Sequence, residues 1–286
     1  MDQSAAQGEA METSVCFMGV KRAPEAGAYR SRQRWAKTLN LQMHLLERVV
    51  EKPHPCTYLE GQRASLDVRV MVDVTAPETD TLLERGWRRF GPIYFRPACA
   101  ACTECVSLRV LVGRFAPTKS QRRAARACSV LRRVVGPPLI DDARLDLYEK
   151  WHASREEARG WDANPQTRER YALEFGFHHP CAREAAFYDD STGEAGGRLV
   201  GVGLFDETPR ALSAAFFFFD PDYARLSLGT ANVLALIADA RTSGRPHVYL
   251  GFRVLGCPSL RYKAGFGPHE LLAGHRPAME EEPSWG

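Results

Sequence analysis

Three cysteines stand close together in one short segment, Cys99, Cys102 and Cys105, with two residues between each pair. Thiols at this spacing can share one metal ion or cluster, and Cys56 is available as a fourth ligand. Four thiolates suit tetrahedral zinc or an iron–sulfur cluster. The alternative is a loop of reduced thiols, because the fourth ligand is distant in the sequence. The other cysteines are expected to be buried or incidental: Cys16, Cys128, Cys181 and Cys257.

The second chemically marked segment is basic and acid-free. From Gly113 to Arg133 it has seven Lys or Arg and no Asp or Glu, although the whole chain carries only +3. The rest of the chain is therefore net negative. Its spacing predicts a helix over 118–133 with four cations on one face, Lys119, Arg122, Arg123 and Arg126. A second face holds Gln121, Ala125, Cys128 and Leu131.

Cations packed this densely on one helix face repel one another unless an anion offsets them. Phosphates do so well, and the planar fork of arginine suits them. The segment therefore predicts a polyanion partner, with RNA the leading candidate. The alternative is a solvated surface helix held by its apolar side.

A third candidate site is a loop between a buried strand and a helix. It contains Arg225, Ser227, Leu228 and Gly229. Glycine lets the backbone approach a ligand, and exposed N–H groups at a helix N-terminus bind anions. In acetyltransferase-like folds the equivalent position holds the pyrophosphate of coenzyme A. Strand–loop–helix joints with glycine are also common without any ligand.

The elements that must position these residues follow from hydrophobic periodicity. Strands are predicted at 66–74, 87–96, 106–112, 185–189, 199–205, 211–219 and 248–252. Helices are predicted at 33–51, after a capping box at Thr75 and Glu78, and at 118–133, 141–159, 165–175 and 230–241. This order predicts an α+β fold: a small N-terminal α/β unit with the cysteine loop, then an acetyltransferase-like (GNAT-like) mixed sheet with helices. The predicted parts are residues 1–50, a tail and helix, residues 51–136 and residues 137–280.

Composition narrows the class of protein. The 286 residues are 44% hydrophobic and 26% charged, as in ordinary globular proteins. No apolar run reaches the roughly 18 residues of a spanning helix, and the N-terminus does not resemble a secretory signal. Eight cysteines without an export signal indicate a reducing compartment, so we expect a cytoplasmic protein without a membrane partner.

Several short motifs follow one another along the chain: Cys56-Thr-Tyr58, Gly86-Trp-Arg-Arg89, Tyr94-Phe-Arg-Pro97, Ser120-Gln-Arg-Arg123, Phe219-Asp-Pro-Asp222, Arg225-Leu-Ser-Leu-Gly229, Tyr249-Leu-Gly251 and Tyr262-Lys263 with Pro268. With the cysteine triplet, they make the chain resemble the aminoacyl-tRNA–protein transferases of the N-end rule pathway. It is most similar to the short bacterial leucyltransferases, which are related to eukaryotic arginyltransferases. The resemblance covers roughly residues 54–272.

The resemblance implies an activity. A charged tRNA, leucyl or arginyl, gives its amino acid to the α-amino group of a protein that begins with Asp or Glu, and the product is degraded. The C-terminal half would be similar to acetyltransferase folds, with an aminoacyl ester in place of a thioester. Related eukaryotic enzymes are associated with an iron–sulfur cluster on N-terminal cysteines, here Cys56, Cys99, Cys102 and Cys105.

An aminoacyl ester is already activated, so the transfer needs positioning, proton removal and stabilisation of an oxyanion, with no cofactor and no enzyme nucleophile. The resemblance puts Tyr262 and Lys263 near the reacting carbonyl. Arg225 and the backbone of 227–229 would bind the terminal adenosine or phosphate of the donor. An acidic acceptor needs a cation, for which the candidates are Arg96, Arg123 and Lys263.

Two other classes of protein are alternatives. One is an acyltransferase that uses acetyl-coenzyme A, which fits the Arg225–Gly229 loop but gives the basic helix no task. The other is a non-enzymatic RNA-binding protein with a zinc knuckle.

Overall fold

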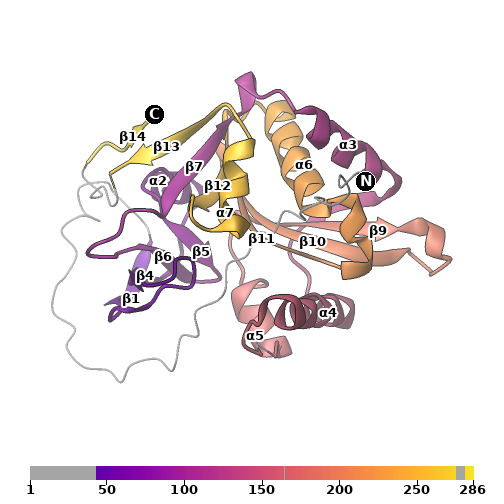
Figure 1. Ribbon diagram of the computed structural model, residues 1–286, viewed down its shortest axis with the longest axis horizontal. Coiled ribbons are helices and arrows are strands. Elements are labelled where there is room, and N and C mark those ends of the chain that lie inside the picture. Colours follow the sequence, from indigo (N-terminus) through magenta and orange to yellow (C-terminus); the bar gives the residue numbers. More distant parts are fainter. Residues whose placement is uncertain (1–42, 164, 275–280) are drawn as a thin grey trace, which may run out of the picture.

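A large mixed sheet lies between two layers of helices, and a smaller sheet stands beside it (Figure 1). The computed structural model describes residues 43–163, 165–274 and 281–286. The α+β class expected from the sequence, with a large mixed sheet and helices, is confirmed.

The large sheet has eight strands, in which β11 and β12 pair in parallel and the other neighbours pair antiparallel. In spatial order they are β14 (Ser284–Trp285), β13 (His269–Ala273), β7 (Val106–Leu111), β12 (His247–Arg253), β11 (Ala211–Phe219), β10 (Arg198–Glu207), β9 (Ala182–Asp189) and β8 (Arg132–Gly136). Helices α3 (Lys119–Ala127) and α6 (Leu228–Thr242) lie on one face, and α4 (Asp142–Arg159) and α5 (Arg168–Glu174) on the other (Figure 1).

The core of the large sheet explains the run of phenylalanines in β11. Successive side chains of a strand point to opposite faces, so a strand buried on both faces is apolar throughout. Phe216 and Phe218 contact the aromatic rings of Tyr148 and Trp151 on α4. Phe217 packs edge to face against Phe187 of β9. The predicted doubly buried strand is confirmed.

The small sheet is antiparallel. Its strands, in order, are β1 (His44–Val50), β4 (Leu66–Val72), β6 (Ile93–Pro97) and β5 (Arg88–Phe90). Helix α2 (Ala76–Glu84) begins with the predicted capping box of Thr75 and Glu78. The short strands β2 (His54–Pro55) and β3 (Arg63–Ala64) pair beside this sheet. Helix α7 (Pro258–Arg261) and the 3-10 turn η5 (Tyr262–Gly265) connect β12 to β13.

The two faces of β4 differ in an unexpected way. Asp67, Arg69 and Met71 are buried, whereas Leu66 and Val68 on the opposite face are only half-buried. The alternation predicted from the sequence is confirmed, but the aliphatic face is not the one that is fully covered. A half-exposed aliphatic face lies open to a pocket, as described below.

Two predicted helices are wrong in part. Within 33–51, the segment His44–Val50 is strand β1, because pairing with β4 overrides its helical spacing; residues 33–42 lie outside the described residues. Helix α3 ends at Ala127, and Arg132 and Arg133 belong to β8, which pairs with β9. On α3 the buried alanine is Ala124, and the predicted Ala125 is exposed.

The predicted boundary at residue 137 does not separate the two sheets. Strands β7 and β8 and helix α3 precede that residue, yet both strands belong to the large sheet and α3 packs against α6. Non-local strand pairing, which sequence periodicity does not report, decides this arrangement.

Candidate active site

The large sheet opens between its two parallel strands. Strands β11 and β12 pair over three residues, Ala211 to Ser213 against His247 to Tyr249. Just beyond, each strand carries a bulge on its other side: Ala215 is the extra residue opposite β10, and Leu250 is the extra residue opposite β7. Bulges bend strands and commonly adjoin active sites. The backbone beyond the paired region is therefore open to a ligand.

A pocket, called the polar pocket here, occupies this opening. It is lined by β5, β6, β11, β12 and the α7–η5 segment, and its charged members are Arg88, Arg89 and Lys263. Among the described residues that line it there is no carboxylate. A pocket with three cations favours anionic groups and developing negative charge.

Lys263 is the most unusual group in the polar pocket. Its side chain is buried (4% exposed), and its Nζ donates a hydrogen bond to the carbonyl of Phe252 at 3.0 Å. Burial, followed by the nearby charge of Arg88, lowers the pKa of Lys263 to about 7. A large fraction of this amine is therefore neutral at physiological pH and able to accept a proton.

Arg88 lies beside Lys263. Its Nη1 donates to the hydroxyl of Ser213 at 2.6 Å, and its Nη2 donates to the carbonyl of Ala214. Burial lowers the pKa of Arg88 to about 10, so it remains charged near neutral pH. A Cβ placed on Gly251, whose φ is +77°, would lie 3.5 Å from both Arg88 Nε and Lys263 Nζ. The backbone of β12 thus runs directly past the two cations.

Buried polar contacts hold the small sheet against the large one around this pocket. Arg89 of β5 forms an ion pair with Asp206 of β10, and both side chains are under 10% exposed. The hydroxyl of Thr208 bonds Asp80 of α2. Tyr94 of β6 lies 3.0 Å from the Nε2 of buried His179. Because these contacts span both sheets, Arg88 and Lys263 are placed by the packing of the whole molecule.

The basic helix α3 lies on the surface. Gln121, Ala124 and the following Cys128 are buried, whereas its four cations, Lys119, Arg122, Arg123 and Arg126, are exposed. None of these four forms an ion pair with any carboxylate in the described part of the chain. Arg132 and Arg133, by contrast, pair with Asp190 at 2.8 Å and Asp239 at 2.6 Å. The four cations of α3 are therefore called available here, because no described carboxylate pairs with them. Arg132 and Arg133 are called committed, because each already forms an ion pair.

Helix α3 connects two other predicted site segments. Near its start, Gln121 Nε2 donates to the carbonyl of Gly265 in η5, at 3.1 Å, two residues beyond Lys263. Just after its end, the Cys128 thiol donates to the carbonyl of Leu226 at 3.2 Å, next to the predicted donor loop. Nine residues at 1.5 Å each make the helix about 14 Å long. Helix α3 therefore bridges the Lys263 segment and the donor loop, with its four cations on the exposed face.

The predicted donor loop begins helix α6. Ser227 is its N-cap and has a left-handed backbone, with φ of 57°, and Arg225 is exposed. The side chain of Leu228 is fully buried, so only its backbone is available to a ligand. Gly229 is half-buried. The loop offers N–H groups at the start of a 15-residue helix, which is a favourable anion site.

Two predicted residues lie away from the polar pocket. The guanidinium of Arg96 stacks on Trp87 at 4.6 Å and lies 4.0 Å from Asp67, on the buried face of the small sheet. Tyr262 packs at the edge of the main apolar cluster, its ring centre 6.5 Å from that of Phe266. Of the acceptor-binding candidates, Lys263 lines the polar pocket and Arg123 lies on α3.

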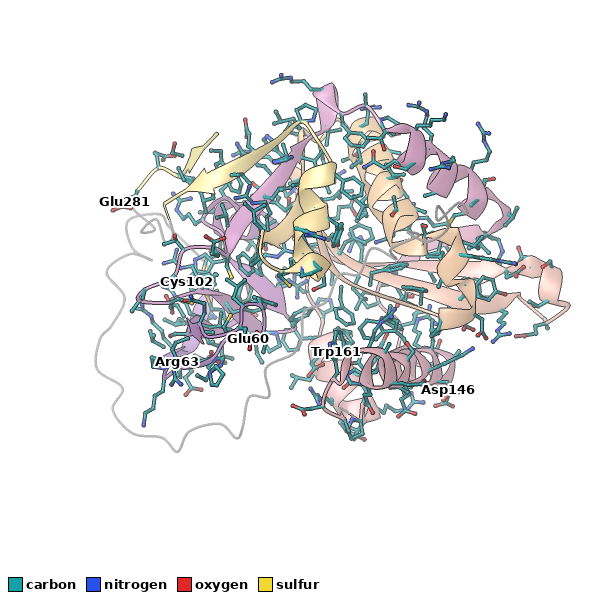
Figure 2. All side chains as sticks on the ribbon, in the orientation of Figure 1. Glu60, Arg63, Cys102, Asp146, Trp161 and Glu281 are labelled. Atoms are coloured by element: carbon teal, nitrogen blue, oxygen red, sulfur yellow. The ribbon has the colours of Figure 1, made fainter. Side chains whose placement is uncertain are left out.

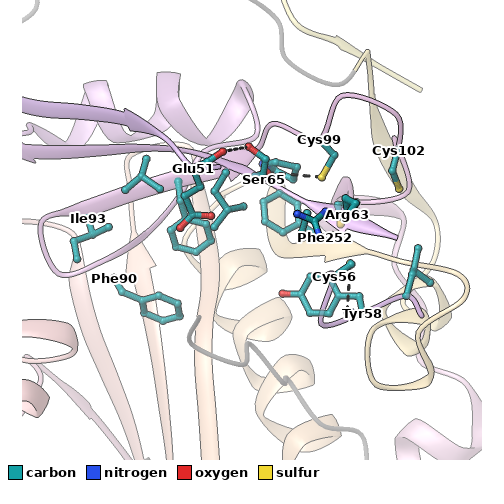
Figure 3. A pocket seen from close by; sticks show the side chains of 17 residues that line it. Glu51, Cys56, Tyr58, Arg63, Ser65, Phe90, Ile93, Cys99, Cys102 and Phe252 are labelled. Carbon is teal, nitrogen blue, oxygen red and sulfur yellow. Dashed lines mark hydrogen bonds between the residues drawn. The ribbon is translucent and has the colours of Figure 1, made fainter. Parts of the chain in front are cut away.

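The four cysteines gather around a second pocket, called the apolar pocket here and defined by Tyr58, Leu66, Val68, Ile93, Phe95 and Phe252 together with Cys56, Cys99, Cys102 and Cys105 (Figure 3). It lies on the small-sheet side of the molecule, where Figure 2 shows Cys102 and Arg63. The apolar pocket and the polar pocket share four lining residues, Tyr58, Phe90, Phe95 and Phe252.

The thiols as placed do not form a metal site. No group of three or more His, Cys, Asp or Glu in the described ranges is arranged to hold a metal ion. Cys99 donates instead to the carbonyl of Ser65 at 3.7 Å, and the thiol of Cys56 accepts from the Tyr58 N–H at 3.4 Å. Burial and the neighbouring thiols raise the pKa of Cys105 to about 12. Zinc or an iron–sulfur cluster stays a prediction, and no chemical step is derived through it.

Comparison with known proteins decides the family. The profile described as "Arginine-tRNA-protein transferase, N terminus" matches residues 54–123, and the one described as "Arginine-tRNA-protein transferase, C terminus" matches residues 143–273. The aspartate/glutamate leucyltransferase of Campylobacter jejuni strain 81-176 is 32% identical, over 80% of this chain and 94% of its own. The chain belongs to this transferase family. It is therefore an aminoacyltransferase, which removes the non-enzymatic alternative.

Other relatives carry the same name. The leucyltransferase of Helicobacter hepaticus is 32% identical over 85% of this chain and 98% of its own, and that of Halorhodospira halophila is 36% identical over 77% and 92%. Among solved structures, the C-terminal domain of a lysylphosphatidylglycerol synthetase from Agrobacterium fabrum matches with a TM-score of 0.41 and 13% identity, over 63% of this chain and 58% of that one. None of the described helices combines the length and apolar character that a bilayer crossing requires.

Arg88 and Arg89 were not predicted as site residues from the sequence. They stand in the motif Gly86-Trp-Arg-Arg89, which carried part of the resemblance but received no role. Their position in the polar pocket depends on the contact between β5 and β11, two strands of different sheets. The pair of arginines within that motif was the available signal.

Proposed function

We propose that this aminoacyltransferase moves leucine from leucyl-tRNA to the α-amino group of proteins that begin with Asp or Glu, which marks them for degradation by the N-end rule. The observation that carries the proposal is the polar pocket, with three cations and no carboxylate among its described lining residues. The names of the relatives supply the donor and the acceptor. Arginine is the alternative donor, because both matching family profiles are described by it.

The chemistry needs one proton relay. The acceptor nitrogen attacks the ester carbonyl carbon, the new C–N bond forms, and the C–O bond to the tRNA ribose breaks. The proton lost by the amine must reach the departing ribose oxygen. Neutral Lys263, whose pKa is about 7, accepts that proton and passes it on, while Arg88 stabilises the oxyanion of the tetrahedral intermediate. No covalent enzyme intermediate is needed.

The tRNA follows the basic surface of α3. The exposed cations of α3 contact phosphates of the acceptor stem, and Arg225 with the start of α6 binds the terminal nucleotide. The bond from Gln121 to Gly265 ties that surface to the turn that carries Lys263. Charged tRNA is a cytoplasmic substrate, so the proposal keeps the location expected from the sequence.

The acidic residue of the acceptor is attracted by the cations of the polar pocket. Arg88 takes the place predicted for Arg96, because Arg96 is stacked on Trp87 beside Asp67. Arg123, at the exposed face of α3, stays a second candidate. The same cations that bind an acidic acceptor then disfavour a basic one.

A transfer assay with purified components tests the proposal. The chain is incubated with leucyl-tRNA or arginyl-tRNA and with peptides that begin with Asp, Glu or Ala but are otherwise identical. We expect leucine on the Asp and Glu peptides and little on the Ala peptide. Uncharged tRNA and acetyl-coenzyme A serve as controls. Acetyl transfer without aminoacyl transfer contradicts the proposal, and arginine transfer alone changes the donor.

A further inference from the structure

We propose that the apolar pocket holds the side chain of the leucyl group during transfer, and thereby selects an aliphatic donor. This inference rests on the proposed function, and it assigns the half-exposed aliphatic face of the small sheet a task. The first supporting observation is adjacency. The apolar and polar pockets share Tyr58, Phe90, Phe95 and Phe252, so the two pockets adjoin one another at these side chains.

The covalent structure of the donor requires a space for its side chain next to the polar pocket. The side chain of an aminoacyl ester begins one bond from the reacting carbonyl carbon. If the carbonyl lies beside Lys263 and Arg88, the side chain must enter a space that adjoins the polar pocket. The apolar pocket is such a space, and Figure 3 shows the rings of Tyr58, Phe90 and Phe252 around it, from three separate parts of the chain.

The chemistry of the walls favours a branched aliphatic group. Leu66 and Val68 of β4, together with Ile93 and Phe95 of β6, face the pocket while the polar alternates Asp67 and Arg96 are buried behind them. Each methylene transferred from water to such a surface contributes about 0.8 kcal/mol.

The charges of the apolar pocket argue against an arginyl side chain. The lining contains one carboxylate, Glu51, and one guanidinium, Arg63. His54 Nε2 lies 3.4 Å from the Glu51 carboxylate, and Arg63 donates to the carbonyl of Pro53. The two formal charges offset one another. Glu51 Oε2 is buried and makes no hydrogen bond to a described residue, and Arg63 already supplies a guanidinium to the same lining. A second guanidinium would lose its hydration and leave the lining with a net positive charge, which is costly.

The acceptor does not suit this pocket. Its first side chain is an Asp or Glu carboxylate, and Arg88 and Lys263, which form no ion pair with a described carboxylate, line the polar pocket. The two pockets therefore divide the substrates by polarity, with the donor side chain in one and the acceptor carboxylate in the other.

The test changes the size of the apolar pocket and the size of the donor side chain together. One tRNA body is charged with leucine, valine, alanine or phenylalanine, so that all tRNA contacts stay constant, and kcat/KM is measured with an Asp peptide. For the natural chain we expect roughly tenfold or greater losses from leucine to valine and again to alanine. Val68→Phe should lower leucine transfer at least about tenfold while changing alanine transfer much less.

Val70→Phe is the matched control, because Val70 lies on the same face of the same strand, two residues away, and does not line the pocket. It should leave the leucine-to-alanine ratio unchanged. Val68→Ala, a milder substitution, should raise the use of phenylalanine relative to leucine. Thermal unfolding of each variant checks its folding.

The outcomes separate the two proposals. If the natural chain does not transfer leucine to the Asp peptide, the proposed function fails. If it does, but Val68→Phe and Val68→Ala leave the donor ratios unchanged, only the pocket assignment is wrong. If the Val68 variants alter the KM of the acceptor peptide and not the donor ratios, the apolar pocket serves the acceptor and this inference is overturned.

Discussion

Two sets of cations in this molecule differ in their surroundings. Those of α3 are exposed, on a helix face with no ion pairs to the described carboxylates. Those of the polar pocket, Arg88, Arg89 and Lys263, are partly or fully buried and fixed by contacts with both sheets. Salt screens exposed charges strongly and buried ones much less. The first set is therefore suited to hold a polyanion, and the second to act on one bond.

The comparison also separates charge from reactivity. Exposure keeps the α3 side chains hydrated and open to a phosphate. Burial moves the pKa of Lys263 to about 7, which lets its amine exchange a proton near neutral pH. Each of the following substitutions should affect one set and spare the other.

The largest effect is expected for Lys263→Met, which keeps the length and apolar stem of the side chain but removes the amine. Loss of a proton relay should lower kcat about 10²- to 10⁴-fold with little change in tRNA affinity. Steady-state kinetics measures the loss of kcat, and a separate binding measurement gives the tRNA affinity. Arg261→Met is the control, because Arg261 is an exposed cation two residues away. A full kcat for Lys263→Met means that the lysine is not the relay.

The pH dependence of kcat/KM should show the ionisation of Lys263. Protonation of Lys263 below about pH 7 removes its base form, so kcat/KM should fall about tenfold per pH unit there, in addition to the fall from the acceptor amine near pH 8. In Lys263→Met the ionisation near 7 should disappear. A pH–rate profile that is identical in both proteins contradicts the assignment.

Stability should change with pH in the matching direction. The folded state binds fewer protons at Lys263 than the unfolded state between the folded pKa of about 7 and the ordinary value of 10.5. Stability should therefore rise with pH across that window, and this contribution is lost as pH falls toward 7. Urea midpoints of the natural chain and Lys263→Met should converge at high pH. Parallel curves would sink this explanation.

The basic helix should show a salt-dependent effect on binding. Replacing both Arg122 and Arg123 with alanine should reduce the slope of log affinity against log salt by about 2 and leave the rate at saturating tRNA unchanged. The matched control is the pair Arg132 and Arg133 replaced in the same way, because Asp190 and Asp239 already engage them. Filter binding at several salt concentrations measures both. Equal slopes for the two double variants contradict the division between available and committed cations.

Much of this organisation could be predicted from the sequence, but unevenly. Local signals placed α2, α4, α6 and β11 correctly, since capping, periodicity and a run of phenylalanines are properties of short segments. The basic helix was correct in position but overextended, because β8 is defined by its partner β9.

The candidate site was less predictable because it is assembled from distant segments. Lys263 was identified through the family motif, whereas its burial depends on β5 from the other sheet. Arg96 carries the predicted charge, but it lies on the opposite face of β6 from Phe95, which lines the polar pocket. The reason is that a strand presents alternate residues to opposite faces.

The smallest predicted effect concerns the link between the two sets of cations. Gln121 accepts a hydrogen bond from the Thr118 N–H at 2.8 Å and donates one to the carbonyl of Gly265 at 3.1 Å. Gln121→Glu keeps the acceptor for the helix cap but loses the donor, which should cost about 1 kcal/mol of stability and lower kcat/KM a few-fold. Thr118→Ala loses the capping hydroxyl instead and should cost a similar free energy with no effect on kcat. If both variants alter kcat equally, helix stability alone explains the change, and α3 does not position the turn that carries Lys263.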